Sequence, residues 1–316
     1  MRSSVQRASQ FVSSYLFPMQ RNQHCSKAWL KDFKLAEKYS SKKRLKDCRI
    51  QIWRQTQAIA RSRDYHGASS FVTSYKVQSD FNPPLEDRTQ EVLVIPTDIL
   101  SMAVKLRRQG VTVAVLNMAC DRVPGGGVDN GCGAQEENLY RRTDMCLATR
   151  EYHCHHYPLR GQALITSPVV VMRGAEEEGY PLLDIGERIT VISCAAPKNP
   201  TLSENGCYAN GWERLEMRRR IQNVLHAASL TACHTILLSA FGCGAYKNPP
   251  YEVARLFHEE LQHKRLQRVI FCIKEDHNSF RNNQIGNFLQ FQAVFPSTCC
   301  ESSWKGWSCQ ICGQQN

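Results

Sequence analysis

The stretch that decides the fold is VTVAVLNMACDRVPGGGVDNGCGAQEENLYRR, residues 111–142. It runs from an apolar segment into three consecutive glycines, Gly125 to Gly127, and then into two adjacent carboxylates, Glu136 and Glu137. A near-continuous apolar strand is expected where helices cover both faces of a parallel sheet. Glycines after such a strand let the backbone adopt positive φ and approach a ligand closely. The stretch predicts a strand, a binding loop and a helix that begins at the glutamates.

The sequence on both sides alternates strand and helix patterns. EVLVIP (91–96) is typical of a strand, and the next segment has one apolar helical face before Gly110, made by Ile99, Met102, Ala103 and Leu106. Downstream, strands are expected at 163–173, 189–197, 235–240 and 268–274, and helices at 211–230 and 249–261. The pattern predicts an α/β fold with a mostly parallel sheet between helical layers and no internal repeat.

A second glycine loop follows another apolar strand, in HTILLSAFGCGAYKNPP (234–250), and Pro249-Pro250 opens the helix after it. Ligands of open α/β sheets bind at the carboxyl edge, where backbone amides and helix N-termini converge. A diphosphate held between the two loops is the expected ligand. Neither loop has the Gly-Lys-Ser/Thr ending of a P-loop or the spacing of a dinucleotide fingerprint.

The composition is that of a globular protein with one main domain: 316 residues, 42% hydrophobic and 22% charged. The net charge of +11 lies in residues 1–64, because residues 65–316 contain 25 basic and 25 acidic side chains. Fifteen scattered cysteines indicate a reducing compartment, and no apolar run is long enough to span a bilayer. We therefore expect an intracellular protein with no membrane contact, and a monomer.

Residues 1–43 are expected to form a basic, partly disordered extension or a targeting segment. Arg2, Arg7 and Arg21 with no acidic residue before Asp32 fit a mitochondrial presequence, whereas KKRLK (42–46) fits a nuclear signal. A solvated arm and an arm that contacts nucleic acid are further alternatives. Cytoplasm or nucleus is the expected location, with the mitochondrion as the alternative.

At this point the sequence resembles a known family. VLNMACDRVPGGG, seven residues and then QEE are similar to the motif of the microbial-type poly(ADP-ribose) glycohydrolases, a branch of the macrodomain fold. SAFGCGAYKNPPYEVARLFHEEL resembles the family's second, diphosphate-binding loop, and VISCAAP and YRR resemble further segments. The resemblance covers residues 44–295. It implies a macrodomain-like three-layer α/β/α sandwich that cleaves ribose-ribose O-glycosidic bonds of poly(ADP-ribose), without a metal or organic cofactor.

The same resemblance implies residue roles. Glu137 would be the general acid and then the base, and Glu136 would hydrogen-bond ribose. The substrate would further contact Asn117, Gly125, Gly126, Gly127, Gln135, Gly242, Cys243, Gly244, Ala245 and Tyr246. Arg122 and Lys247 depart from the family's pattern, and either side chain would assist phosphate binding or simply be exposed.

Each feature also has a simpler interpretation. Adjacent helical residues point about 100° apart, so Glu136 and Glu137 do not straddle one bond, and both would also complement a helix dipole. The rival functions are a non-catalytic ADP-ribose reader, a hydrolase of mono-ADP-ribosylated proteins, and a nucleic-acid binder with a passenger α/β domain.

The tail, residues 296–316, is rich in cysteine and tryptophan. WKGWSCQICGQQN resembles the first half of a RanBP2-type zinc finger, but four thiolates are needed for a closed zinc site. We expect a degenerate or truncated finger, with Cys309 and Cys312 as candidate ligands of a structural zinc ion.

Overall fold

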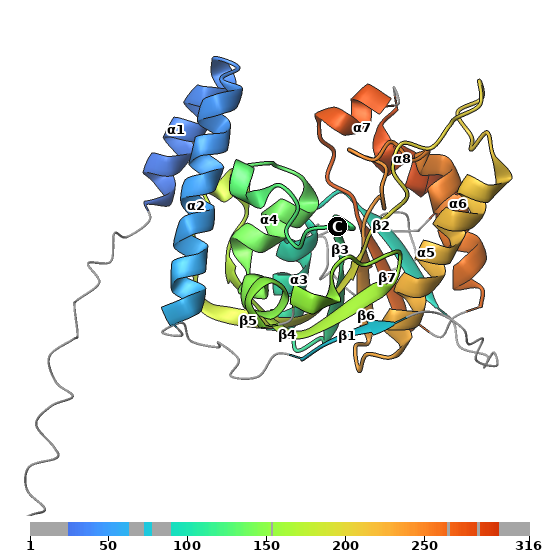
Figure 1. The fold of residues 1–316 in the computed structure, drawn as a ribbon, viewed down its shortest axis with the longest axis horizontal. Coiled ribbons are helices and arrows are strands. Elements are labelled where there is room, and N and C mark those ends of the chain that lie inside the picture. Colours follow the sequence, from blue (N-terminus) through green and yellow to red (C-terminus); the bar gives the residue numbers. More distant parts are fainter. Residues whose placement is uncertain are drawn as a thin grey trace, which may run out of the picture.

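The computed structural model of the chain describes residues 25–62, 73–77, 90–152, 154–263, 266–282 and 285–296 (Figure 1). Seven strands form one sheet in the order β1-β4-β5-β3-β6-β7-β2. The strands are β1 (Thr73–Val77), β2 (Glu91–Ile95), β3 (Val113–Met118), β4 (Ala163–Arg173), β5 (Leu182–Cys194), β6 (Thr235–Leu238) and β7 (Arg268–Cys272).

The sheet is mixed and mostly parallel. β5, β3, β6, β7 and β2 run parallel to one another, whereas β4 is antiparallel to both of its neighbours, β1 and β5. β3 is central, and its residues from Val113 to Asn117 are all buried. This arrangement confirms the predicted α/β class.

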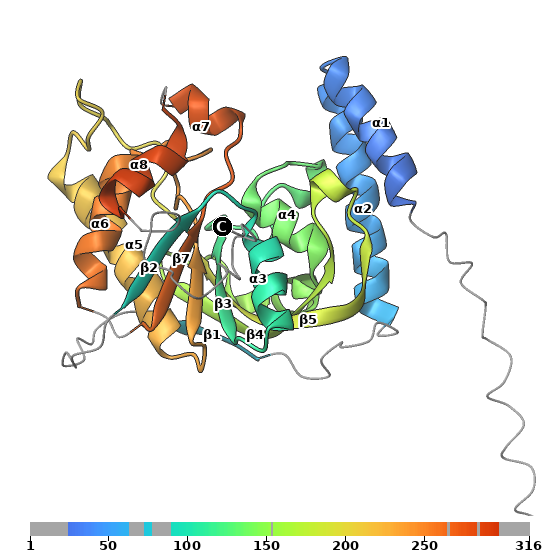
Figure 2. The ribbon, with the colours of Figure 1, turned by 180° about the vertical axis from the view of Figure 1, so that it is seen from behind.

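Helices cover both faces of the sheet (Figures 1 and 2). One face carries α5, α6 and α8 over an apolar core that includes Phe257 and Phe291, and the other carries α3 and α4 over a core that includes Leu106 and Tyr140. The helices are α1 (Ser26–Lys38), α2 (Lys42–Ser62), α3 (Ile99–Arg108), α4 (Gln135–Arg142), α5 (Gly211–Ser229), α6 (Pro250–Leu261), α7 (His277–Asn282) and α8 (Gly286–Val294). The expected three-layer sandwich is therefore present.

The predicted helices begin where the local chemistry favours them. Asp98 caps α3 by accepting from the Ser101 amide at 2.7 Å. Pro250 opens α6, at a position where a helix needs no backbone donor. The apolar stripes that helical spacing predicts for these segments are buried: Ile99, Met102, Ala103 and Leu106 on α3, Met217, Ile221, Val224, Leu225 and Ala228 on α5, and Val253, Ala254, Phe257 and Leu261 on α6.

The expected sheet was mixed and mostly parallel, and β4 forms at the predicted residues, but two other parts of the antiparallel region were missed. β5 begins at Leu182, seven residues before the predicted start, and pairs along its length with β4. The first half of β5 is partly exposed, so it lacks the continuous apolar run that marked the other strands. β1, which forms the edge beside β4, was also not predicted.

The predicted boundary between residues 43 and 44 is wrong in the part that the structure describes, because it falls inside α2. α1 and α2 pack together around Trp29, Phe33 and Ile52, and Tyr180 from the main domain completes this cluster. Residues 26–43 are thus part of the fold, since their apolar face is buried against it. The presequence and arm predictions for residues 1–24 lie outside the described residues.

Cys309 and Cys312 also lie outside the described residues, so a tail zinc site stays a prediction. Among the residues that are described, no group of three or more histidine, cysteine or acidic side chains is arranged to hold a metal ion. None of the described helices combines the length and the apolar character needed to cross a membrane.

Candidate active site

The two glycine loops lie side by side at the carboxyl edge of the sheet. β3 and β6 are parallel neighbours, and their C-terminal ends lead into residues 119–134 and 239–249 respectively. The first loop leads into α4, whose first turn contains Glu136 and Glu137. These two residues are only 3% and 8% exposed. Two carboxylates are therefore buried at the edge where α/β folds bind ligands.

Glu136 is held by three donors from the end of β3 and the first loop. Its Oε2 accepts from the Cys120 amide at 2.7 Å, and its Oε1 accepts from the Gly125 amide at 3.1 Å and from Asn117 Nδ2 at 3.4 Å. Asn117 also donates to Ser193 Oγ on β5 at 3.1 Å. Both oxygens of Glu136 thus serve to fix the loop against the sheet.

The glycines are required because the loop backbone lies directly against these carboxylates. Gly126 has a φ of +52°, and a Cβ placed on it would lie 2.7 Å from Glu137 Oε1 and 2.9 Å from Glu136 Oε2. Gly125 has a φ of +82°, and its Cβ would lie 2.9 Å from the Tyr140 ring. A side chain at either position would displace groups that are themselves buried.

Glu137 has one oxygen engaged and one without a partner. Its Oε1 accepts from the Gly127 amide at 2.9 Å. Its Oε2 is buried and has no hydrogen-bond partner among the described residues. Because buried polar atoms in folded proteins are nearly always satisfied, this oxygen marks a position where a ligand group would bind.

One of the two carboxyls, Glu136, favours its protonated form. Burial raises the pKa of Glu136 to about 8; the Cys120 amide opposes this shift and the charge of Glu137 adds to it. A carboxyl that retains a proton near pH 7 is what general-acid chemistry requires.

Gln135, a predicted sugar-contacting residue, is engaged by the protein itself. Its Oε1 accepts from the Met118 amide at 2.9 Å, and its Nε2 donates to the Leu116 carbonyl at 2.8 Å. The side chain therefore pairs with the backbone of β3 and ties the start of α4 to the central strand. Direct contact of Gln135 with a sugar stays a prediction.

The second loop is held in shape by Asn248. Its Nδ2 donates to the carbonyls of Pro197 and Gly242 at 2.8 and 3.1 Å. Gly242 has a φ of +74°, and a Cβ there would lie 2.5 Å from the side chain of Ala196. Of the other residues predicted to bind the diphosphate, Cys243 is buried, Gly244 partly buried and Ala245 exposed.

Tyr246 in the second loop is close enough to the carboxylates for their charges to act on it. Burial raises the pKa of its phenol, and the charges of Cys120, Glu136 and Glu137 raise that pKa further. Lys198 Nζ lies 5.3 Å from the centre of the Tyr246 ring. The structure thus brings the predicted residues of both loops to one place, whereas Arg122 and Lys247 are exposed.

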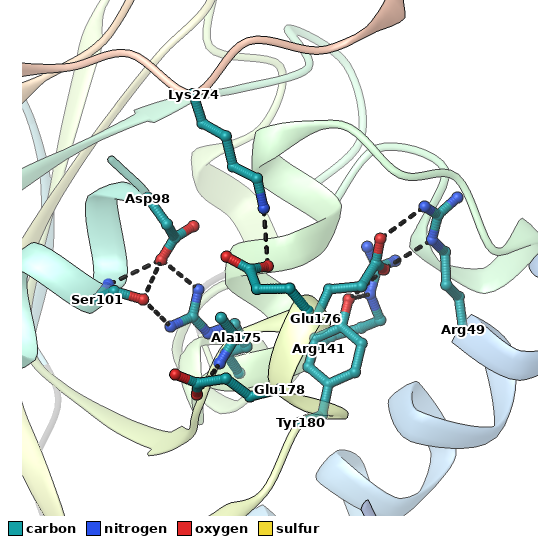
Figure 3. Close-up of polar contacts among 11 residues, drawn as sticks. Arg49, Asp98, Ser101, Arg141, Ala175, Glu176, Glu178, Tyr180 and Lys274 are labelled. Atoms are coloured by element: carbon teal, nitrogen blue, oxygen red, sulfur yellow. Dashed lines mark hydrogen bonds and ion pairs between the residues drawn. The ribbon is translucent and has the colours of Figure 1, made fainter. Parts of the chain in front are cut away.

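Helix α2 holds the first loop and α4 in place through a series of side-chain hydrogen bonds, which we call the clamp from α2; Figure 3 shows the part of it that joins Arg49, Glu176, Tyr180 and Arg141. Arg49 on α2 makes two 2.8 Å hydrogen bonds to Glu176, which also accepts from Tyr180 Oη at 2.7 Å. Tyr180 Oη in turn accepts from Arg141 Nε at 2.9 Å, and Arg141 Nη1 donates to the Cys132 carbonyl of the first loop at 2.6 Å. The chain of bonds fixes α4, and with it both glutamates.

Further contacts from α2 reach the loop directly. Trp53 Nε1 donates to Asp129 at 2.7 Å, and Thr56 Oγ1 donates to the Arg141 carbonyl at 2.7 Å. A Cβ placed on Gly133 would lie 2.5 Å from the Arg49 guanidinium, so the loop passes directly against this side chain. Sequence reasoning missed these positioning residues. The sequence signal that could have indicated that α2 packs on the main domain is its stripe of residues at helical spacing, all of them buried: Cys48, Ile52, Trp53, Thr56 and Ala60.

Comparison with known proteins agrees with this geometry. The model of the family described as "Microbial-type PARG, catalytic domain" matches residues 35–173, a range that includes the first glycine loop and α4. This match confirms the family resemblance, and it begins within α1, consistent with a fold that includes this helix. No curated protein matches the sequence.

Solved PARG structures share the fold. The poly(ADP-ribose) glycohydrolase of Thermomonospora curvata is 21% identical with a TM-score of 0.63, and the alignment covers 79% of this chain and 100% of that one. The same enzyme bound to the inhibitor ADP-HPD is 22% identical with a TM-score of 0.61, over 78% and 98% of the two chains. The Deinococcus radiodurans PARG in complex with ADP-ribose is 21% identical with a TM-score of 0.56, over 79% and 93%.

Proposed function

We propose that this protein is a poly(ADP-ribose) glycohydrolase, which cleaves ribose-ribose O-glycosidic bonds and releases ADP-ribose. The family match over residues 35–173 supports this assignment, and solved structures with the same fold are PARG enzymes, some of them bound to ADP-ribose. The site adds a buried carboxylate pair between two glycine loops. One carboxyl of this pair, directed at the substrate, can carry out the proton transfers of glycoside hydrolysis.

The observation that carries the proposal is the unpaired Oε2 of Glu137. All other carboxylate oxygens of the pair accept hydrogen bonds from the protein, so this one is directed to the substrate. In the reaction, Glu137 donates its proton to the ribose oxygen that leaves as the glycosidic C–O bond breaks. It then accepts a proton from the water whose oxygen bonds to the anomeric carbon, which restores the acid.

We propose the remaining roles from the family resemblance together with these positions. Glu136 and Asn117 fix the first loop that holds the ribose, and Gly125 to Gly127 allow the backbone to approach the sugar and phosphate. Residues 242–245 supply backbone amides for the diphosphate, and Tyr246 packs on the ribose. A diphosphate folded over the oxocarbenium-like centre would stabilise its positive charge.

Replacement of Glu137 by glutamine tests the proposal. Glutamine keeps an oxygen for the Gly127 amide but has no proton to donate as an acid, so we expect kcat for ADP-ribose release from labelled polymer to fall by about 10²- to 10⁴-fold. The affinity for ADP-ribose should stay within about threefold, since the loops are unchanged. Glu37→Gln, at an exposed carboxylate on α1, is the matched control and should keep full activity.

The same assay separates the rival functions. A reader would bind ADP-ribose and the polymer, with no turnover by the wild type. A mono-ADP-ribosyl-protein hydrolase would release ADP-ribose from singly modified proteins and leave polymer chains intact. Deletion of residues 1–24, which leaves α1 in place, should spare hydrolysis; if it abolished all polymer contact, the basic arm would be the binding element.

The proposed chemistry uses carboxyls, backbone amides and water, and we propose that it needs no metal or organic cofactor. Activity should therefore survive exhaustive treatment with a chelator. A loss that only an added divalent cation restored would contradict this part of the proposal. Zinc binding by Cys309 and Cys312 is a separate question, which metal analysis of the full chain before and after Cys309→Ser and Cys312→Ser would answer.

A further inference from the structure

A concave site lies at the same edge of the sheet as the two glycine loops, between α5, β1 and the loop before β4. It is a groove of about 860 Å³, which is within the size range of small-ligand pockets. β1 and α5 lie beside each other in both views of the fold (Figures 1 and 2). The residues that matter for its chemistry are Lys76, Tyr157, Arg160, Glu216, Arg219 and Arg220.

The groove is strongly basic within an otherwise neutral part of the chain. Four cationic side chains line it, and Glu216 is the single acidic residue among the described residues of its wall. Arg219 and Arg220 share this one carboxylate, at 4.0 and 2.5 Å. The surplus is three positive charges, whereas residues 65–316 as a whole contain equal numbers of acidic and basic side chains. Such a local surplus attracts anions.

Two of these cations, Lys76 and Arg160, are near enough for their charges to act on each other. Lys76 donates one proton to the Pro158 carbonyl at 2.8 Å, which leaves two further N–H donors on its ammonium group. Burial lowers the pKa of Lys76, and the nearby positive charge of Arg160 lowers it further, whereas the negative charge of Asp121 raises it. The like charges of Lys76 and Arg160 repel each other, and an anion bound between them would reduce that repulsion.

The backbone of the loop before β4 adopts left-handed conformations at two consecutive residues, Arg160 and Gly161. Arg160 has a φ of +51°, in the left-handed region that non-glycine residues rarely adopt. The next residue, Gly161, has a φ of +81°, and a Cβ there would overlap the guanidinium of Arg220. Asn223 Nδ2 donates to the Gly161 carbonyl at 2.8 Å and fixes the loop to α5.

The groove adjoins the candidate active site. The amide of Leu159 donates to the Asp121 carbonyl at 2.8 Å, and Asp121 follows Cys120, whose amide holds Glu136. Tyr157 lines the groove, and its phenol lies near enough to Tyr140 and Glu136 for both to raise its pKa, after burial. A polymer that leaves the carboxylate pair on this side would therefore pass directly into the groove.

We propose that this cationic groove is a second anion-binding subsite, which holds the diphosphate of the poly(ADP-ribose) unit next to the one whose bond is cleaved. The inference rests on the proposed function and extends it to the substrate class: the enzyme distinguishes polymer from single ADP-ribose units through Lys76 and Arg160. Each unit of the polymer carries one diphosphate, so two sites on one protein edge suit two consecutive units. Linked contacts of this kind strengthen binding without changing either site alone.

Charge reversal tests the subsite. Binding of labelled poly(ADP-ribose) and of ADP-ribose is measured in a Glu137→Gln background, to prevent turnover, for the double variant Lys76→Glu/Arg160→Glu. The control is Lys31→Glu/Lys34→Glu on α1, which alters the net charge equally at exposed positions. We expect polymer affinity to fall by about tenfold or more in the groove variant only, and the slope of log K against log salt to decrease by about 2. ADP-ribose affinity should be unchanged.

The remaining outcomes are also decisive. Arg160→Ala, at an exposed position, replaces the double variant if the latter does not fold, and should weaken polymer binding by about threefold. Polymer affinity and salt slope equal to those of the control would overturn the inference. Single-stranded RNA that bound as tightly as the polymer, with the same loss in the variant, would overturn the assignment to poly(ADP-ribose). If the wild type failed to cleave polymer, the proposed function itself would fail; normal cleavage with unchanged polymer affinity would remove only the subsite.

Discussion

Gly126→Ala is the substitution that most directly tests how the first glycine loop supports the carboxylates. The added Cβ would lie 2.7 Å from Glu137 Oε1 and 2.9 Å from Glu136 Oε2, and ordinary contact begins at 3.4 Å. One or both carboxylates must therefore move by about 0.5 to 0.7 Å, or the loop must shift by the same amount. Because both side chains are buried and hydrogen-bonded, neither can simply swing into solvent.

The magnitude of the effect has two parts. A φ of +52° costs alanine about 1 to 2 kcal/mol relative to glycine, which is a loss of stability. Displacement of a catalytic carboxyl by a large fraction of an ångström costs up to about 10²-fold in rate. We therefore expect kcat for polymer hydrolysis to fall by about 30- to 100-fold, with a modest decrease in Tm.

Gly110→Ala is the matched control. Gly110 also has a positive φ, +82°, but a Cβ there would contact nothing within 4 Å. This variant should lose a similar amount of stability and keep its activity. The assay is steady-state release of ADP-ribose from labelled polymer, together with thermal unfolding of both variants. If the kcat of Gly126→Ala stayed within threefold of that of Gly110→Ala, the idea that these glycines accommodate the catalytic carboxylates would be refuted.

Two further predictions concern stability. Burial raises the pKa of Asp144 to about 6, so the folded state binds more protons than the unfolded state between about pH 4 and 6, and stability falls as pH rises through that window. Asp144→Asn keeps the acceptor for the Val170 amide. The variant should show no decrease of Tm with pH in this window, and above pH 6 it should be more stable than the wild type by on the order of 1 to 3 kcal/mol. Parallel curves of Tm against pH for the two proteins would contradict this. Arg49→Met should lower the free energy of unfolding in urea by about 1 to 3 kcal/mol, because it leaves Glu176 without two hydrogen bonds. Arg61→Met removes only an exposed ion pair and should lower it by less than about 0.5 kcal/mol. Equal losses in these two variants would show that the clamp from α2 adds no stability.

Much of the fold and part of the site follow from local patterns in the sequence. The apolar run before Met118, the stripe on α5 and the proline pair before α6 each report on a few consecutive residues, and all three elements form where expected. The placement of Glu136 and Glu137 in a first helical turn is local in the same sense. Two glycine loops after parallel strands also had to meet at one edge, because parallel neighbours end on the same side.

Other features depend on contacts between distant parts of the chain, which no local pattern contains. Arg49 and Glu176 are 127 positions apart, and Thr56 meets Arg173 across 117, so the clamp on α4 exists only once α2 has docked. The basic charge of residues 1–43 pointed instead to a separate extension, because the buried face of α1 has no visible partner until the main domain forms. Gln135 likewise carries an amide that suits a sugar, and only the folded chain shows that β3 engages it.

The sequence thus specified the chemistry of the site, since residue identity and short-range spacing decide which groups follow which strand. The tertiary structure alone decided which oxygen of the carboxylate pair lacks a partner, and which cations gather in the groove beside it. The physical reason is that burial and hydrogen bonding depend on how separate elements pack and in what register. These properties emerge only when residues far apart in the chain come into contact.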